Sequence, residues 1–277
     1  MNKIFNESNI QEANRRYYDE YGQYYEEYQS YFKNVALLRQ WNENIQRIKS
    51  ALLPLGNMKA LDFGCGTGLL TFMLLELGFS VTAIDISENM LSELQKKTNR
   101  LSKDIAKRLQ CIHGGIEVLE RLPEESFSII CESSVLQHVH DYATFPRKCQ
   151  KLLISGGVLY IGREPLHKDE RWRFPLNFPL YLLFSLIDSW IINKINRGKF
   201  KEVFDPDMVP QYYKGGVNSR ALIETGYKEG MEVLFKKTYN WRYTSSIFTL
   251  DNMLPRFLRY ESHWNAFFDL ALQKRKK

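Results

Sequence analysis

The chain has 277 residues, of which 44% are hydrophobic and 25% charged, and its formal net charge is +6. This is an ordinary composition for a soluble globule that buries a full core, built as one large domain or as a domain with an insertion. The basic residues are spread along the chain except in the tail "QKRKK", so they give no footprint for nucleic acid, and we expect none as a partner.

The cysteines form no Cys-x-x-Cys pair, and the histidines complete no zinc spacing; the four are Cys65, Cys111, Cys131 and Cys149. We therefore expect reduced core thiols, no metal, and a cytoplasmic protein. The N-terminus lacks the apolar core of a signal peptide. Prolines and Asp188 interrupt the most apolar stretch, residues 174–192, so we expect no transmembrane segment, while peripheral membrane contact stays open.

Residues 13–53 have a helical period that ends at Pro54. Tyrosines recur there at steps of three or four and make one stripe: Tyr17, Tyr21, Tyr24, Tyr28 and Tyr31. Packing against the rest of the domain explains most of this stripe. We predict that residues 1–53 form an N-terminal helical lid.

From Lys59 onward, short apolar runs alternate with amphipathic helices. This alternation predicts a mostly parallel sheet covered on both faces, within a core of residues 54–162. The pattern indicates strands at 59–63, 80–86, 109–114, 127–134 and 158–162, helices at 68–78, 87–102 and 143–153, and a turn at 154–157. Ser87 can cap the second of these helices.

Residues 163–217 break the alternation with aromatics and prolines and are predicted to be an inserted cap. The core resumes over 218–277, with a helix at 218–227 closed by Gly226, strands at 231–241 and 264–276, and a helix at 245–260 between them. The expected fold class is α/β. It is a Rossmann-like, mostly parallel seven-stranded sheet with helices on both faces, an N-terminal helical lid and an inserted cap.

The stretch "ALDFGCGTGLL" places Gly64, Gly66 and Gly68 between the first strand and its helix. Glycine lets the backbone approach a ligand, and ligands of such sheets bind at the carboxyl ends of the strands. The spacing is G-x-G-x-G, because Leu69 stands where the dinucleotide fingerprint has glycine. Asp62, two residues before the first glycine, suits an ammonium group and not a pyrophosphate.

The second predicted strand ends in Asp85, which is placed to accept hydrogen bonds from two ribose hydroxyls. The neighbouring Ile86 can cover one face of a purine. The helix that follows the glycine turn offers free backbone N–H groups to a carboxylate. Ammonium, carboxylate, ribose and purine together describe S-adenosylmethionine (SAM).

Four segments in order, "LDFGCGTG", "AIDIS", "FSIICESSVLQHVHD" and "LLISGGVLYIG", resemble the motifs of class I SAM-dependent methyltransferases of the small-molecule type, which includes quinone-biosynthesis enzymes. The resemblance covers about residues 55–165, and residues 217–277 more weakly. It implies that the glycine turn with Cys65 and Thr67 borders the methionine part of SAM, that Asp62 supports the ammonium and that Asp85 holds the ribose. Tyr25, followed by Glu26, would sit beside SAM.

The turn after the third strand departs from the family pattern, because Gly115 stands where an adenine-binding Asp is frequent. The adenine contacts would then come from backbone groups, with Ile116 against the ring. Glu117 is an alternative partner for the base, or else a solvated surface residue.

Two residues are candidates for catalysis. Glu132, at the end of the fourth strand, would point toward the transferring methyl and orient or deprotonate an acceptor; the alternative is a hydrogen bond to SAM or to a loop N–H. His138 has acid/base chemistry near neutral pH, although a structural role is also open.

The predicted function is methyl transfer to the O, C or N atom of a small, apolar or aromatic acceptor, by a monomer or homodimer. The aromatic residues of the cap could line the acceptor pocket, cover the sheet or form a dimer interface. The alternatives are an RNA or protein methyltransferase, against which the scattered basic residues argue, and a non-catalytic SAM-binding protein.

Overall fold

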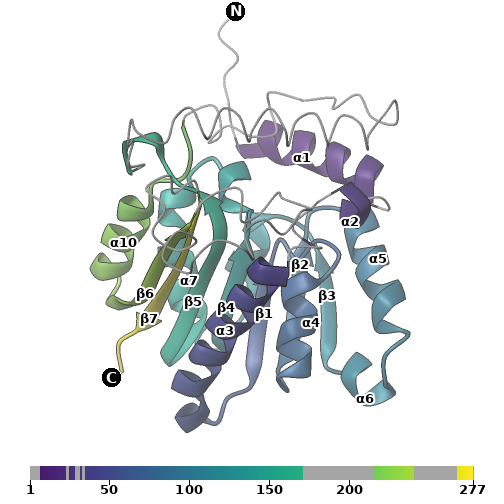
Figure 1. Ribbon diagram of the computed structural model, residues 1–277, viewed down its shortest axis with the longest axis horizontal. Helices are drawn as coiled ribbons and strands as arrows, with labels where there is room; N and C mark the ends of the chain where they lie inside the picture. The colour runs from purple at the N-terminus through teal and green to yellow at the C-terminus, as the bar shows by residue number, and fades with distance from the viewer. Residues whose placement is uncertain are drawn as a thin grey trace, which may run out of the picture.

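The computed structural model describes residues 7–22, 25–28, 32, 35–170, 215–239 and 267–276. Its centre is one seven-stranded sheet in the order β3-β2-β1-β4-β5-β7-β6 (Figure 1). The strands are β1 (Lys59–Phe63), β2 (Ser80–Asp85), β3 (Leu109–His113), β4 (Phe127–Ser133), β5 (Leu153–Pro165), β6 (Met231–Tyr239) and β7 (Phe267–Lys274). The predicted fold class is confirmed.

The first five strands run parallel to one another, and β7 inserts antiparallel between β5 and β6. Strand order reverses at β1, which pairs with β2 on one side and β4 on the other. The carboxyl ends of β1 and β4 therefore meet at a topological switch point, where ligands of open α/β sheets bind.

Helices cover both faces of the sheet. On one face, α3 (Val35–Leu52) and α4 (Leu69–Glu76) contribute Trp41 and Leu74 to a buried apolar cluster; on the other, α7 (Phe145–Leu152) and α10 (Ser219–Lys228) contribute Phe145 and Leu222. The remaining helices lie at the β2–β3 end of the sheet or across its carboxyl edge (Figure 1): α5 (Glu88–Thr98), α6 (Lys103–Ala106), α1 (Glu7–Tyr21) and α2 (Tyr25–Tyr28).

Local details confirm some predictions and correct others. The Ser87 hydroxyl caps α5 by accepting from Met90 N at 3.2 Å, as predicted. The helix expected over 13–53 is instead α1, α2 and α3. The predicted turn at 154–157 lies within β5, because these residues bulge out between the pairs Phe127–Leu153 and Ile129–Val158.

Helix α10 passes through Gly226 and ends at Lys228, before the left-handed Gly230 (φ 76°). The expected strand ends at 240–241 and 264–266 and the helix expected at 245–260 lie outside the described residues.

Most of the predicted cap, residues 171–214, also lies outside the described residues. Its two flanks meet: Leu166 forms a parallel bridge with Val217, and Val217 O accepts from His167 N at 3.0 Å. A segment that leaves and returns at the same place has the form of an insertion, although the domain boundaries stay a prediction.

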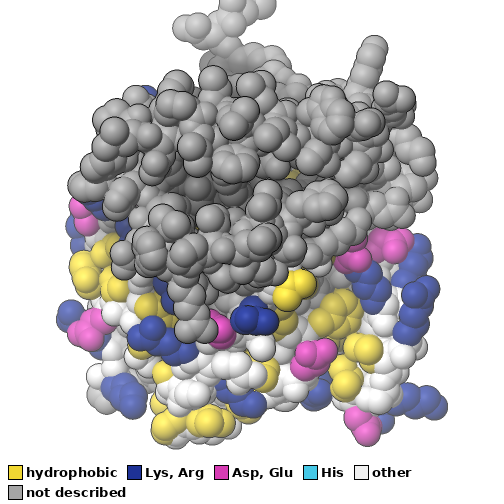
Figure 2. All heavy atoms as spheres, in the orientation of Figure 1, with side chains coloured by type: hydrophobic (Ala, Val, Ile, Leu, Met, Phe, Trp, Pro, Cys, Tyr) yellow, Lys and Arg dark blue, Asp and Glu magenta, His cyan; other side chains and the backbone are white. Residues whose placement is uncertain are grey.

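All four cysteines are free thiols. Within the described ranges, none of the helices is both long and apolar enough to cross a bilayer. On the face shown in Figure 2, acidic side chains lie among the lysines and arginines of the described surface, so no patch of one sign dominates it.

Candidate functional site

The glycine turn after β1 is hydrogen-bonded to the end of β2. Gly64 and Gly66 have φ angles of 70° and 53°, a left-handed conformation that glycine adopts without strain. Gly64 N and Cys65 N both donate to Ile84 O, at 2.8 and 2.9 Å, and Gly66 N donates to Asp85 Oδ2 at 2.7 Å. The turn therefore stands rigidly at the switch point.

Two adjoining pockets lie at this turn. The large pocket, about 710 Å³, extends from Gly64 and Gly66 past Asp85 to Ile116. The small pocket, about 390 Å³, is lined by Asp62 and by the glycine turn from Gly64 to Thr67. Both are lined by Tyr25, Gly64, Gly66 and Ser133, so they form two ends of one elongated space.

Most predicted site residues line these pockets. In the large pocket they are Tyr25, Gly64, Gly66, Asp85, Ile86, Gly115, Ile116 and His138. In the small pocket they are Tyr25, Asp62, Gly64, Cys65, Gly66 and Thr67. Gly68 and Glu132 line neither pocket.

Gly68 serves packing. A Cβ at this position would lie 2.4 Å from Leu94 Cδ1 and 3.0 Å from Phe72 Cε2, so the missing side chain makes room for α5. Its φ of 98° also favours glycine at the residue before α4. These contacts give Gly68 a packing role, and its place beside the ligand stays a prediction.

Glu132 does not point into the site, contrary to the expectation of a carboxylate near the acceptor. It is fully buried, and its Oε2 accepts a hydrogen bond from Val135 N at 3.1 Å. The alternative reading, a bond to a loop N–H, is the one that the structure shows. Burial, and then the neighbouring Glu164, raise the pKa of Glu132 well above its usual range, so it holds a proton.

The two aspartates at the site differ in partners but share an environment. Asp85 Oδ1 accepts from Ser87 N at 2.9 Å, in addition to the bond from Gly66 N. Asp62 Oδ2 accepts from Thr71 Oγ1 at 2.5 Å. Burial raises the pKa of each to about 6, and these hydrogen bonds limit the rise.

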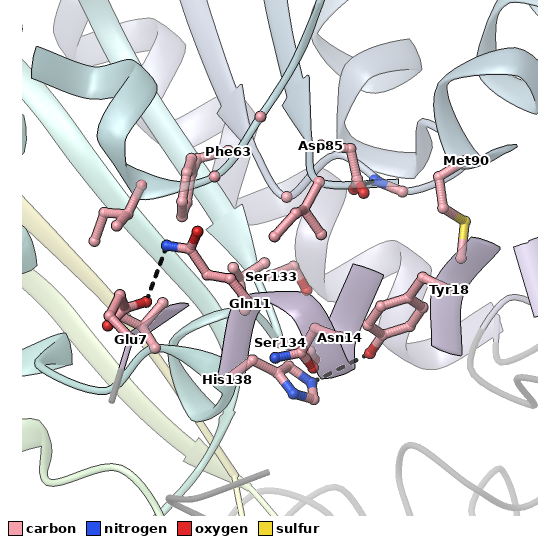
Figure 3. A pocket seen from close by; sticks show the side chains of 18 of the residues that line it. Glu7, Gln11, Asn14, Tyr18, Phe63, Asp85, Met90, Ser133, Ser134 and His138 are labelled. Carbon is pink, nitrogen blue, oxygen red and sulfur yellow. Dashed lines mark hydrogen bonds between the residues drawn. The ribbon is translucent and has the colours of Figure 1, made fainter. Parts of the chain in front are cut away.

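Helix α1 crosses over the large pocket and supplies residues that the sequence analysis missed (Figure 3). Glu7, Gln11, Asn14 and Tyr18 line the pocket at steps of three and four along one helix face. The same spacing is readable in the sequence, on a different face of the predicted helix from the tyrosine stripe. Of that stripe, Tyr17 is the one member whose side chain is described.

The helix is docked at both ends. His140 N donates to Glu7 Oε2 at 3.1 Å, and Ser87 Oγ donates to Asp19 Oδ1 at 2.7 Å. These contacts hold α1 to the loop after β4 and to the start of α5.

Helix α2 closes the small pocket. The Thr67 hydroxyl donates to Glu26 Oε1 at 2.5 Å, and Lys97 forms an ion pair with the same carboxylate. The ring of Tyr25 packs edge-on against Tyr18, with centroids 5.9 Å apart. The Tyr25–Glu26 pair therefore ties the N-terminal helices to the glycine turn.

A polar cluster faces the large pocket from α1 and the loop after β4. The Tyr18 hydroxyl lies 3.2 Å from His138 Nε2 (Figure 3). Burial raises the pKa of Tyr18 well above its usual value, so its hydroxyl stays neutral. Asn14 Oδ1 is a buried acceptor for which the described part of the chain supplies no donor. The same described ranges contain no cluster of three or more acidic, His or Cys side chains that could hold a metal ion.

In comparison with known proteins, residues 61–161 match a family model described as a methyltransferase domain. The ubiquinone biosynthesis O-methyltransferase of Caulobacter vibrioides is 34% identical over 116 residues, 41% of this chain and 43% of that protein. The human mitochondrial ubiquinone biosynthesis O-methyltransferase is 38% identical over 133 residues, 48% of this chain and 34% of that protein. The similarity thus spans about half the length of these curated relatives or less.

Two solved structures share the fold at low sequence identity. The magnesium protoporphyrin IX methyltransferase of Synechocystis with bound SAM has a TM-score of 0.55 at 14% identity, covering 99% of this chain and 100% of that one. The geranyl diphosphate C-methyltransferase of Streptomyces coelicolor also has a TM-score of 0.55, at 12% identity, covering 96% and 98%.

Proposed function

We propose that this chain, whose residues 61–161 form a methyltransferase domain of the class I, SAM-dependent kind, transfers a methyl group from SAM to a small-molecule acceptor. The observation that carries the proposal is the elongated space at the switch point. Its glycine turn, Asp85 and the β3 turn follow one another along the carboxyl edge of three adjacent strands.

The residues present fit this cofactor. A Cβ on Gly66 would meet no described atom within 4 Å, so the glycine opens directly onto the space that both pockets share. We assign the small pocket, with Asp62, to the amino-acid end. We assign Asp85 to the ribose and the Ile86 and Ile116 side of the large pocket to the base.

When bound, SAM supplies an electrophilic methyl group carried on a sulfonium. Transfer of such a group requires mainly alignment and the exclusion of water. Tyr25, which lines both pockets, would shield the junction between them from solvent. The rigid hydrogen bonds of the glycine turn would keep the cofactor in one position.

We propose a hydroxyl on a ring-bearing, apolar molecule as the acceptor. The curated relatives are named as O-methyltransferases, which supports O-methylation, and they match this chain over only part of their length. His138, in the pocket beside the Tyr18 hydroxyl, is our candidate for taking up the hydroxyl proton.

Incubation of the purified chain with methyl-labelled SAM tests this function. The acceptors would be supplied as three separated fractions of a bacterial extract: small molecules extractable into organic solvent, total RNA, and protein. We expect label in the first fraction, on an oxygen atom identified by mass spectrometry. Label in RNA or protein alone would contradict the substrate class, and tight S-adenosylhomocysteine (SAH) binding without any labelled product would indicate a non-catalytic binder.

A further inference from the structure

We infer that Gln11, on the lid helix α1, recognises the exocyclic amino group of the adenine, and that Glu7 fixes which end of the Gln11 amide faces the base. This inference rests on the proposed function and adds to it a specificity-determining pair outside the matched domain.

The first observation concerns Gly115, whose backbone conformation does not require glycine. Gly115 has φ −102° and ψ −151°, an extended conformation open to any residue. A Cβ there, however, would lie 2.9 Å from Gln11 Oε1 and 3.0 Å from Gln11 Cδ. Gly115 therefore makes room for the Glu117 carboxylate and for the amide of Gln11; of the two side chains, Gln11, which enters from α1, lines the large pocket.

The second observation is that the amide has one orientation. Gln11 Nε2 donates to Glu7 Oε1 at 3.2 Å, and an ionised carboxylate can only accept (Figure 3). The other oxygen of Glu7 is held by His140 N at 3.1 Å. Gln11 Oε1 is consequently the end next to Gly115, and it offers an acceptor at this part of the pocket.

The third observation concerns position. Gly114, Gly115 and Ile116 follow β3, and the strands order as β3-β2-β1. If the ribose lies at the tip of β2, the base lies beyond it, at β3. An acceptor at that end matches the amino group of adenine and opposes the oxo group of hypoxanthine.

The carboxylate of Glu117, the alternative partner for the base, lies at the same turn, where its Oε2 would be 2.9 Å from a Cβ on Gly115. Its Oε1 accepts from Gly115 N at 2.8 Å, and it is not among the residues that line the large pocket. Base recognition therefore depends on α1 being docked, which couples cofactor binding to the position of the lid.

The test compares SAH with S-inosylhomocysteine, in which an oxo group replaces the adenine amino group, by calorimetry on the full chain. The unmodified protein should bind SAH at least about tenfold more tightly, the scale of one hydrogen bond gained and one repulsion avoided. Gln11→Ala should weaken SAH binding and reduce the ratio to within about threefold. Glu7→Gln should reduce the ratio mainly by improving S-inosylhomocysteine binding, because a glutamine partner lets the Gln11 amide turn over.

Glu20→Gln, an exposed change on the same helix, is the matched control and should keep the original ratio. If Gln11→Ala retains the full ratio, the inference is wrong while the proposed function stands. If the unmodified protein binds neither compound, the proposed function itself fails.

Discussion

The side chains of Glu132 and Glu164 are both fully buried near the carboxyl ends of β4 and β5, and they bind successive backbone N–H groups of one loop. Glu164 accepts from Leu136 N at 2.8 Å and from Gln137 N at 3.1 Å. Together with the Val135–Glu132 bond, the pair therefore shapes the loop that carries His138. Burial disfavours the ionised form of both carboxylates, and a second carboxylate nearby raises the pKa of Glu132 further.

Glu132→Gln tests this account through the pH dependence of stability. Burial raises the pKa of Glu164 to about 7 and that of Glu132 higher. Groups with raised native pKa contribute stability that is present below about pH 4.5, their unfolded value, and is lost as pH rises through the native value. The neutral glutamine removes one proton-binding site. The thermal stability of Glu132→Gln should therefore fall less between pH 5 and 8 than that of the unmodified protein.

The same variant separates a structural role from catalysis. Because Glu132 lines neither pocket, we expect the variant to bind SAH with an affinity within about twofold of the original. Loss of a hydrogen bond to a charged group would instead weaken binding by ~1.5–3 kcal/mol. Glu124→Gln, on the surface, is the control for both measurements. A drop in kcat by about 10²-fold or more at unchanged stability would restore Glu132 as a base.

Asp85→Asn should weaken SAH binding by about 10- to 100-fold, the equivalent of ~1.5–3 kcal/mol for hydrogen bonds to a charged group. Asparagine keeps the shape but presents one donor where the carboxylate accepts. In the unmodified protein, affinity should fall as pH drops below about 6, because burial raises the pKa of Asp85 to that value and ribose hydroxyls bind the ionised form better. Glu88→Gln, nearby and exposed, should leave both properties unchanged.

Removing residues 1–32 should abolish measurable SAH binding but leave the core folded. The three buried apolar clusters that hold the sheet contain no fully buried residue before Leu37. The removed helices, in contrast, supply Gln11, Asn14, Tyr18 and Tyr25 to the pockets. Circular dichroism on the truncated chain measures whether the core is folded, and calorimetry measures SAH binding. Normal SAH binding would show that α1 and α2 serve only packing.

His138→Gln should lower kcat by about 10²–10⁴-fold, the usual share of general acid–base catalysis, while SAH affinity changes little. Tyr18→Phe should have a smaller effect, since the hydroxyl only positions the imidazole at 3.2 Å. His167→Gln, in the flank of the predicted cap, is the control. Equal kcat for His138→Gln and the unmodified protein would assign His138 to structure.

The sequence predicted the sheet and the glycine turn because both depend on local signals: period, N-caps and glycine spacing. Ser87 and Asp85 were placed correctly for this reason. Glu132 was misplaced because residue order does not state which way a side chain near the end of a strand points, and Glu164, which raises its pKa, lies 32 positions later. Gln11 was missed because its meaning comes from Gly115, a contact between distant segments that no local pattern encodes.

The same limitation applies to Asp269, which looks unremarkable in an apolar strand but joins four elements. Its Oδ2 accepts from Gln40 Nε2 and Asn44 Nδ2, both at 2.8 Å; its Oδ1 accepts from Tyr239 Oη and Arg163 N, both at 2.9 Å. The carboxylate is fully buried, so removing it would leave these donors without their acceptor.

We expect Asp269→Ala to lower the free energy of unfolding by about 3–5 kcal/mol, the scale for breaking a buried charged network. Asp269→Asn should lower the free energy of unfolding by less than the alanine change, because its amide keeps one acceptor oxygen. It should still be destabilising, because its NH₂ group would face donors. Urea denaturation of both variants, beside the exposed control Asp169→Ala, measures the difference. A loss below ~1 kcal/mol for Asp269→Ala would mean that water replaces the carboxylate, and that α3 is held to β7 by its apolar contacts alone.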